Sequence, residues 1–366
     1  MTDYKTKPRY ELLDGLRGVA ALMVIWFHIF EGFATSAIDQ KFNHGYLAVD
    51  FFFILSGFVV GYAYDDRWPQ LGLKGFFKRR LIRLHPLVVL GAVFGLIAFA
   101  LQGSVQWDGT HVDFWKVIIA FLLGVFLLPS FPGTPGEVRG NGEMFPLNGP
   151  SWSLLFEYIG NILYAFVLRR LSTKWLKIFV ALSGLSYAAY AMHNGSGTYS
   201  MGVGWTMAGT GFLGGLLRVT FSFSAGLLLS RNFCPRKIKG AFWICAAMIV
   251  ALVSMPYLGK EANVLNGLYD TLCTLFIFPL IIYIGASGTA EGKATSKICT
   301  FLGEISYPVY IIQYPFMYLF YAWLWEHGYT FAQTWPVALA IFLCLPVLAY
   351  ACLKLYDEPV RRWLSR

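Results

Sequence analysis

An arginine and a histidine lie within the first strongly apolar stretch of the chain, Leu12 to Phe30. Ionisable side chains in such a segment usually face the interior of a helix bundle or a water-filled cavity, because a charge is costly in hydrocarbon. Arg17 and His28 are eleven residues apart. On a helix this is about three turns, which places both side chains on one face, roughly 16 Å apart along the axis. Asp14 falls near the same stripe, so the spacing indicates a polar track within a membrane.

Two carboxylates are expected at a depth similar to that of His28. Asp50 lies in the segment GYLAVDFFFILSGF, and Glu157 lies in PSWSLLFEY. A neutral imidazole can take a proton from a hydroxyl near pH 7, and a carboxylate beside it would fix its tautomer and stabilise the imidazolium. We therefore predict that His28 is a general base oriented by Asp50 or Glu157. The alternatives are a structural histidine and a buried ion pair that only holds helices together.

Two arginines three residues apart form an R-x-x-R pattern in FFKRRLIRLHPL. Arg80 and Arg83 would share one face of a helix. The sequence places them at the inner start of the third apolar segment, and helix N-termini and guanidinium groups both bind phosphate well. The alternative is that they are ordinary cytoplasmic loop charges.

The composition predicts a membrane protein. The chain has 366 residues, of which 57% are hydrophobic and only 13% charged, about half the charged fraction of a soluble domain. Apolar segments of ~17 to 25 residues recur, and each is long enough to cross a bilayer. We expect an all-α polytopic membrane protein with about ten transmembrane helices in a single domain, residues 1–366. The expected segments are 12–33, 46–64, 84–102, 151–168, 176–192, 204–230, 241–257, 267–286, 303–325 and 335–354.

Clusters of lysine and arginine predict the orientation of the chain. They lie in the N-terminal tail, in loops 65–83, 169–177 and 231–239, and in the C-terminal tail. Because cytoplasmic loops carry the excess of basic residues, both termini are expected in the cytoplasm. The same rule accounts for most of the net charge of +9. Membrane lipids are therefore expected partners, whereas nucleic acid is not, since no long soluble basic segment is present.

One apolar segment does not fit this alternation. Residues 116–130 (KVIIAFLLGVFLLPS) would place the basic cluster at 169–177 outside if they crossed the membrane. We predict that they form a re-entrant or interfacial helix within a long external loop, residues 103–150. An eleven-span arrangement is the alternative.

Six segments of the chain, in order, resemble the acyltransferase-3 family of integral membrane proteins. They are LDGLRGVAALMVIWFH, with its R-x10-H pair, and then GYLAVDFFFILSGF, KRRLIRLHP, PSWSLLFE, LGEISYPVYIIQYP and YDEPVRRWL. The R-x10-H and R-x-x-R patterns are weak alone, but six matches in family order between residues 12 and 364 are specific. The chain leaves no room for the extracellular SGNH esterase-like domain that some relatives carry, so we expect a stand-alone membrane module.

The resemblance implies O-acylation of a carbohydrate, commonly with an acetyl group taken from acetyl-CoA. By similarity, Arg17 and His28 belong to the active site, and Arg80 and Arg83 hold the CoA phosphates on the cytoplasmic side. The pantetheine arm would follow the stripe from Asp14 to His28 and meet an external carbohydrate acceptor. The resemblance also implies a bacterial inner membrane and no metal ion.

Two further residues are expected to contact the acceptor. Trp152 is either a stacking platform for a sugar or an aromatic residue of the membrane interface. Relatives often have a histidine where this chain has Gln313 in YIIQYP. A glutamine can orient a hydroxyl or a carbonyl but cannot titrate, so Gln313 is predicted to bind and not to transfer protons.

Two other functions remain open at the level of the sequence. The acceptor of an acyltransferase could instead be a small molecule, such as a macrolide, or a lipid-linked sugar. A proton-coupled secondary transporter would also place charges inside the membrane. Against the transporter, the sequence has no evident inverted repeat.

Overall fold

The structure is a computed structural model that describes residue 7 and residues 9–366. Within these residues the regular elements are helices, and strand pairing is limited to isolated bridges. The α-helices are α1 (Glu11–Glu31), α2 (Ala48–Tyr64), α3 (Trp68–Leu101), α4 (Phe114–Val125), α5 (Ser151–Phe166), α6 (Thr173–Met192), α7 (Gly211–Arg231), α8 (Ala241–Val253), α9 (Val264–Leu272), α10 (Phe278–Ser287), α11 (Gly292–Ile312), α12 (Tyr314–His327), α13 (Phe331–Cys352) and α14 (Glu358–Leu364). There are also two short 3-10 helices, η1 (His44–Leu47) and η2 (Leu168–Arg170), and two π-helical segments, η3 (Cys273–Ile277) and η4 (Leu353–Asp357).

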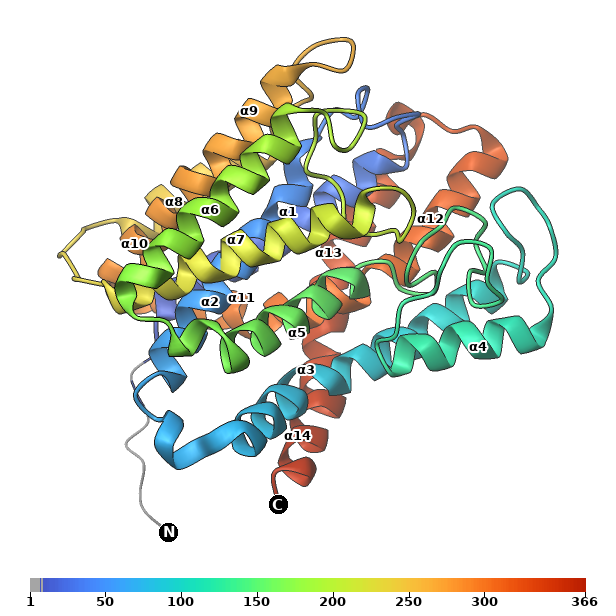
Figure 1. The fold of residues 1–366 in the computed structure, drawn as a ribbon. Helices are drawn as coiled ribbons and strands as arrows, with labels where there is room; N and C mark the ends of the chain where they lie inside the picture. Colours follow the sequence, from blue (N-terminus) through green and yellow to red (C-terminus); the bar gives the residue numbers. More distant parts are fainter. Residues whose placement is uncertain (1–6, 8) are drawn as a thin grey trace.

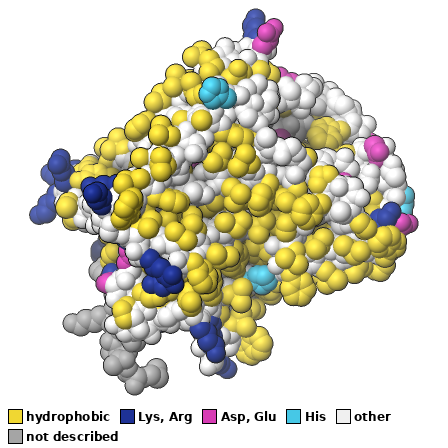
Figure 2. Space-filling model, viewed as in Figure 1, with side chains coloured by type: hydrophobic (Ala, Val, Ile, Leu, Met, Phe, Trp, Pro, Cys, Tyr) yellow, Lys and Arg dark blue, Asp and Glu magenta, His cyan; other side chains and the backbone are white. Residues whose placement is uncertain are grey.

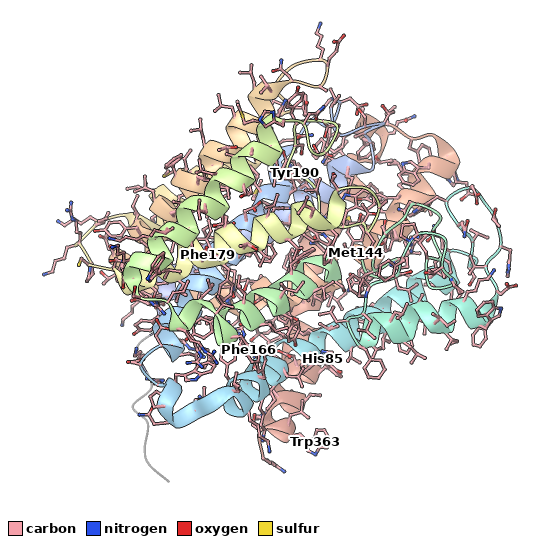
Figure 3. All side chains as sticks on the ribbon, in the orientation of Figure 1. His85, Met144, Phe166, Phe179, Tyr190 and Trp363 are labelled. Atoms are coloured by element: carbon pink, nitrogen blue, oxygen red, sulfur yellow. The ribbon has the colours of Figure 1, made fainter. Side chains whose placement is uncertain are left out.

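The long helices have the size and composition of membrane spans. In the described part of the chain, 8 helices are long and apolar enough to cross a bilayer. Hydrophobic side chains cover most of the face in Figure 2, and Phe166 and Trp363 are exposed large hydrophobic side chains on that outer surface (Figure 3). A surface with this much apolar area is expected to face lipid. The prediction of an all-α polytopic membrane protein is confirmed.

The helices run between two ends of the molecule (Figure 1). We call one the basic end, because it carries the α2–α3, α5–α6 and α7–α8 connections and most of the clustered lysines and arginines. Arg231 ties these connections together by an ion pair to Asp65 at 2.7 Å and a hydrogen bond to the Leu171 carbonyl oxygen at 2.8 Å. We call the opposite end the loop end, which carries segments 32–43, 126–150, 193–210 and 254–263.

Several helix boundaries differ from the expected spans. α3 begins at Trp68, sixteen residues before the predicted 84, and it is kinked at Gly72, where φ is 60°. The predicted span 204–230 begins only at Gly211, because residues 204–210 belong to a loop. The predicted span 303–325 corresponds to two helices, α11 and α12, which are broken at Gln313.

The segment predicted to be re-entrant or interfacial forms α4. This helix has 12 residues, a length of about 18 Å, which is short of the ~30 Å hydrocarbon core. It packs against α3, where Val117 and Ala120 are its buried residues, while Phe114 and Trp115 are exposed. The structure therefore supports a partial helix over an eleventh span.

Glycines allow two pairs of helices to approach closely. A Cβ at Gly57 on α2 would collide with the carbonyl oxygen of Phe223 on α7, and a Cβ at Gly18 on α1 would collide with that of Leu302 on α11. Small residues at helix crossings are the usual means of close packing within membranes. These crossings bring α1 against α11 and α2 against α7, which positions the side chains described next.

Candidate functional site

Two cavities lie between the helices. The first, which we call the arginine cavity, is near the basic end and measures about 90 Å³. The second, which we call the histidine cavity, is near the loop end and measures about 870 Å³. The larger value is in the usual range for a small-molecule site, ~300 to 1,000 Å³, whereas the smaller cavity suits only a narrow chain.

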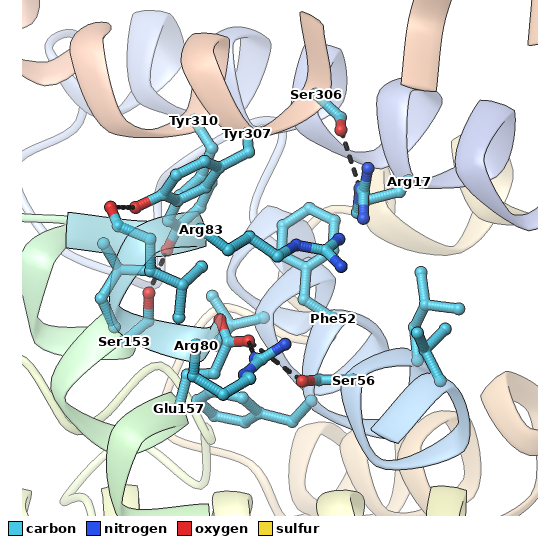
Figure 4. Close-up of a pocket in the computed structure, with 16 residues that line it drawn as sticks. Arg17, Phe52, Ser56, Arg80, Arg83, Ser153, Glu157, Ser306, Tyr307 and Tyr310 are labelled. Carbon is cyan, nitrogen blue, oxygen red and sulfur yellow. Dashed lines mark hydrogen bonds and ion pairs between the residues drawn. The ribbon is translucent and has the colours of Figure 1, made fainter. Parts of the chain in front are cut away.

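Three arginines converge on the arginine cavity (Figure 4). Arg17 comes from α1 and donates to Ser306 Oγ at 2.7 Å and to the Gly303 carbonyl oxygen at 3.1 Å, both on α11. Arg80 and Arg83 lie one turn apart on α3 and line the same cavity. Arg17 of the R-x10-H pair thus lines the same cavity as the R-x-x-R arginines, whereas His28 of that pair lines the other cavity.

Glu157 belongs to this cluster and not to His28. Its Oε1 forms an ion pair with Arg80 and accepts a hydrogen bond from Ser56 Oγ at 3.0 Å. Glu157 is also the one carboxylate among the described residues that line this cavity, while three lining residues are arginines. Asp14 is further out, with Oδ1 3.4 Å from Arg17 Nη2. The cavity is thus cationic and suited to an anionic ligand.

The predicted helix N-terminus at the R-x-x-R pair is wrong. α3 begins at Trp68, so Arg80 and Arg83 lie in the helix interior, where backbone N–H groups are already bonded. Arg80 is buried, whereas Arg83 is an exposed residue. An anion here would be held by side-chain guanidinium groups, which bind phosphate without help from a helix end.

His28 lines the histidine cavity and is paired with Glu31, one turn along α1. The His28 Nδ1 and Glu31 Oε2 atoms are 2.7 Å apart. An ionised carboxylate has no proton to donate, so Nδ1 must carry the proton. In the neutral imidazole this leaves the Nε2 lone pair free to accept a proton, which is the tautomer that a general base needs.

Two tyrosines of α12 hold this pair. The Tyr321 hydroxyl is 3.0 Å from Glu31 Oε2 and 2.6 Å from the carbonyl oxygen of His28. The Tyr314 ring packs edge-on against the imidazole, with ring centroids 4.6 Å apart. These contacts restrict the rotamers of both His28 and Glu31. Sequence reasoning missed Glu31, although its spacing in HIFE, three residues after His28, was a signal for a contact on one helix face.

Asp50 does not orient His28 either. Both Asp50 and Arg218 of α7 are 0% exposed, and Arg218 Nη2 lies 2.8 Å from Asp50 Oδ2. Arg218 also donates to the carbonyl oxygens of Val203 at 2.8 Å and Tyr46 at 2.7 Å. Asp50 therefore pairs with a buried arginine that holds two wall segments of the histidine cavity.

Aromatic rings and loop segments complete the histidine cavity. Its lining includes Trp152 and further rings, namely Phe27, Tyr46, Trp107, Trp205, Tyr310, Tyr314, Tyr318, Tyr321 and Trp325. Arg218 lies 5.1 Å from the Trp152 ring centroid. Loop segments 126–150 and 193–210 meet where the Met144 N–H donates to the Trp205 carbonyl oxygen at 2.9 Å. Figure 2 shows a hollow at this end of the molecule.

A second carboxylate lies at the rim of this cavity. Glu143 accepts hydrogen bonds from the Tyr318 hydroxyl and from Asn141 Nδ2. Burial raises the pKa of Glu143, and the nearby Arg139 guanidinium opposes that rise. Arg139 itself stacks 3.4 Å from the Tyr318 ring centroid. Most of the carboxylate charge at the rim is thus offset by a protein cation.

Gln313 lines neither cavity. Its side chain is 0% exposed at the break between α11 and α12, and Nε2 donates to the Tyr310 carbonyl oxygen at 3.4 Å. The prediction that Gln313 contacts the acceptor is not supported by this position. The residue instead fills the gap where the two helices change direction.

Comparison with known proteins gives one family. A family model described as an acyltransferase domain, that of the acyltransferase-3 family, matches residues 10–353. Acyltransferase MdmB of Streptomyces mycarofaciens is 25% identical over 98% of this chain and 93% of its own length. A putative membrane-bound transacylase, BcsY, of Komagataeibacter xylinus is 24% identical over 86% of this chain and 74% of its own length.

A shorter relative has higher identity. Protein 2 in the picA locus of Rhizobium radiobacter is 35% identical over 48% of this chain and 92% of its own length. No solved protein structure matches the chain. Because the family model covers nearly all of the helical bundle that forms both cavities, the chain belongs to the acyltransferase-3 family and is a membrane acyltransferase.

Proposed function

We propose that this protein transfers an acetyl group from acetyl-CoA, bound at the basic end, to a hydroxyl group of a carbohydrate bound at the loop end. The observation that carries the proposal is the difference between the linings of the two cavities. Three arginines line one cavity, and a histidine with its carboxylate partner lines the other. Such an arrangement suits an anionic donor and a hydroxyl acceptor that arrive from opposite ends.

The arginine cavity would receive the donor. With Arg17, Arg80 and Arg83 against Glu157, its lining carries a surplus of positive charge. Guanidinium groups pair with phosphate oxygens in a bidentate manner, and CoA carries several phosphates. Since the cavity is narrow, the phosphates would dock at its mouth and the pantetheine arm would enter.

The histidine cavity would receive the acceptor and perform the proton transfer. His28 Nε2 accepts the proton of the acceptor hydroxyl, and the oxygen attacks the carbonyl carbon of the thioester. The carbon–sulfur bond then breaks, and the CoA sulfur leaves with the proton that the imidazolium returns. Glu31 stabilises the imidazolium at 2.7 Å. The products are an acetyl ester and free CoA, and no covalent enzyme intermediate is needed.

The aromatic lining supports a carbohydrate acceptor. Trp152 and the tyrosines around His28 offer flat apolar faces beside polar hydroxyls, the usual combination in a pocket that orients a polar ligand. A cavity of about 870 Å³ also has room for more than the reacting group.

The distribution of basic residues supports one orientation of the protein in the membrane. The basic end would face the cytoplasm, where CoA is found, and the loop end would face outward. We place the protein in a bacterial inner membrane, surrounded by lipid at its apolar belt.

The function can be tested with labelled donor. Membranes that contain the protein are incubated with [¹⁴C]acetyl-CoA and a panel of glycans, macrolides and lipid-linked sugars. We expect acceptor-dependent release of free thiol together with label in a carbohydrate. Label in a macrolide would correct the acceptor class, and thiol release that never depends on an added acceptor would contradict the proposal.

Removal of the two R-x-x-R guanidinium groups should weaken donor binding. In the double variant Arg80→Ala/Arg83→Ala, we expect the KM for acetyl-CoA to rise by at least about 10-fold, because each charge-assisted hydrogen bond contributes ~1.5 to 3 kcal/mol. The measurement is initial rate against acetyl-CoA concentration. Arg170→Ala is the matched control, since Arg170 is exposed at the same end and lines neither cavity. Equal KM values in the two variants would exclude the phosphate role.

Neutralisation of the carboxylate beside His28 should slow the chemical step. We expect Glu31→Gln to lower kcat by about 10- to 100-fold, since a hydrogen bond to a charged group is worth ~1.5 to 3 kcal/mol. The KM for acetyl-CoA should change little, because Glu31 lies outside the arginine cavity. Glu326→Gln is the control, since Glu326 is exposed on α12 and does not line the site. A normal kcat for Glu31→Gln would show that the pair is not used.

A further inference from the structure

The two cavities have a common wall. Only two of the described residues line both of them, Val49 on α2 and Tyr310 on α11. Each is nearly buried, with 5% and 6% of its surface exposed. Val49 is the second residue of α2, and Tyr310 lies about one turn before the break at Gln313. The shared lining places these two side chains between the two cavities.

The tyrosine in this wall is held from two sides. Its hydroxyl is 2.7 Å from Ser153 Oγ on α5. Ser153 Oγ also donates to the Pro150 carbonyl oxygen at 3.0 Å, which uses its only proton. Tyr310 must then be the donor to Ser153. On the other side, the Phe52 ring packs edge-on at a centroid distance of 5.5 Å. One hydrogen bond and one ring contact thus fix the position of Tyr310.

We propose that the wall formed by Tyr310 and Val49 selects the acyl group, and that it does so by limiting the width of the passage between the two cavities. The inference rests on the proposed function. An acetyl group needs the smallest displacement of the Tyr310 ring, and every added methylene must displace it further. The same wall keeps water of the histidine cavity away from the thioester until an acceptor is in place, which would limit hydrolysis of the donor.

The test compares acyl donors of increasing length. The kcat/KM values of the unaltered protein are expected to fall from acetyl-CoA to propionyl-CoA to butyryl-CoA. In Tyr310→Ala, the ratio of kcat/KM for butyryl-CoA to that for acetyl-CoA should rise by at least about 10-fold, the low end of the discrimination that one methylene provides in a tight site. Release of thiol without an acceptor should rise in the same variant. Val49→Ala should move both quantities in the same direction and serves if Tyr310→Ala does not fold.

A matched buried tyrosine controls for general damage. Tyr187 is 0% exposed, and its hydroxyl is 3.0 Å from Thr274 Oγ1, but it lines neither cavity. Tyr187→Ala should therefore leave the donor ratio unchanged. If both Tyr310→Ala and Val49→Ala still transfer acetyl groups with an unchanged butyryl-CoA to acetyl-CoA ratio of kcat/KM, the two side chains do not select the acyl group. The proposed function would then remain intact. Failure of the unaltered protein to use any acyl-CoA would overturn both.

Discussion

Replacement of His28 by alanine is expected to lower kcat by about 10²- to 10⁴-fold, the usual contribution of a positioned general base. The reason is the arrangement at the loop end of α1. Glu31 accepts the Nδ1 proton at 2.7 Å, so the opposite nitrogen is the one available to an acceptor hydroxyl. The measurement is single-turnover transfer of [¹⁴C]acetyl from acetyl-CoA, with protein amount and thermal midpoint matched to the unaltered chain.

A nearby histidine gives the control. His44 is buried, its Nδ1 lies 2.8 Å from the Met255 carbonyl oxygen, and it lines neither cavity. His44→Ala should lower the stability of the protein. The folded fraction should nevertheless keep a kcat within about 10-fold of normal, because loss of a general base lowers kcat by at least about 10²-fold. Acetyl transfer at the normal rate by His28→Ala would remove His28 from the mechanism.

Loss of one partner of the Asp50–Arg218 pair is expected to lower the free energy of unfolding by about 3 to 5 kcal/mol, because an uncompensated buried charge remains. Both side chains are 0% exposed, and the guanidinium also holds the carbonyl oxygens of Val203 and Tyr46. Asp50→Asn and Arg218→Met can be compared by thermal aggregation in detergent, followed by size-exclusion chromatography.

The double variant separates charge from packing. In Asp50→Leu/Arg218→Met the unpaired charge is gone, so the loss of stability should be smaller than the sum of the two single losses. The carbonyl oxygens of Val203 and Tyr46 still lose their donor, so the stability of the double variant should remain below that of the unaltered protein. If Asp50→Asn were fully stable and yet inactive, Asp50 would act in catalysis, and the structural assignment made here would be wrong.

The sequence was sufficient to predict the apolar helices and several of the polar residues within them. The apolar segments, the R-x10-H pair and the R-x-x-R pair all lie in helices, and Arg17, Arg80 and Arg83 meet at one cavity. Depth follows from counting residues along a helix at a fixed rise per residue. The alternation of basic loops predicted that residues 116–130 are not a full span.

The lateral position of each side chain could not be derived in the same way. Asp50, Glu157 and His28 were expected at similar depths, but a shared depth does not place them side by side in a bundle of this size. Asp50 faces α7 and Glu157 faces α3, whereas His28 faces α12. The partner of Asp50 was itself overlooked, although Arg218 is an ionisable residue within an apolar segment and should have raised the same question as Arg17.

Helix starts were equally hard to derive. The first turns of α3, which include the basic residues 74–83, lie at the basic end of the molecule. These turns carry no continuous apolar run that would predict a membrane span, so the predicted helix started too late. The break at Gln313 is followed by Pro315 at the start of α12. Proline near the start of a helix is a local signal, but only the packed structure shows that the glutamine is buried and lines neither cavity.

The sidedness of the reaction tests the central claim, that donor and acceptor reach His28 from opposite ends of the molecule. Sealed right-side-out and inside-out vesicles containing the protein can each receive external [¹⁴C]acetyl-CoA, with His28→Ala vesicles as the blank. Transfer is expected only in inside-out vesicles, where the basic end faces the medium, and the labelled ester should be protected within the lumen. Equal labelling from either side, or label that stays on the donor side, would contradict the account.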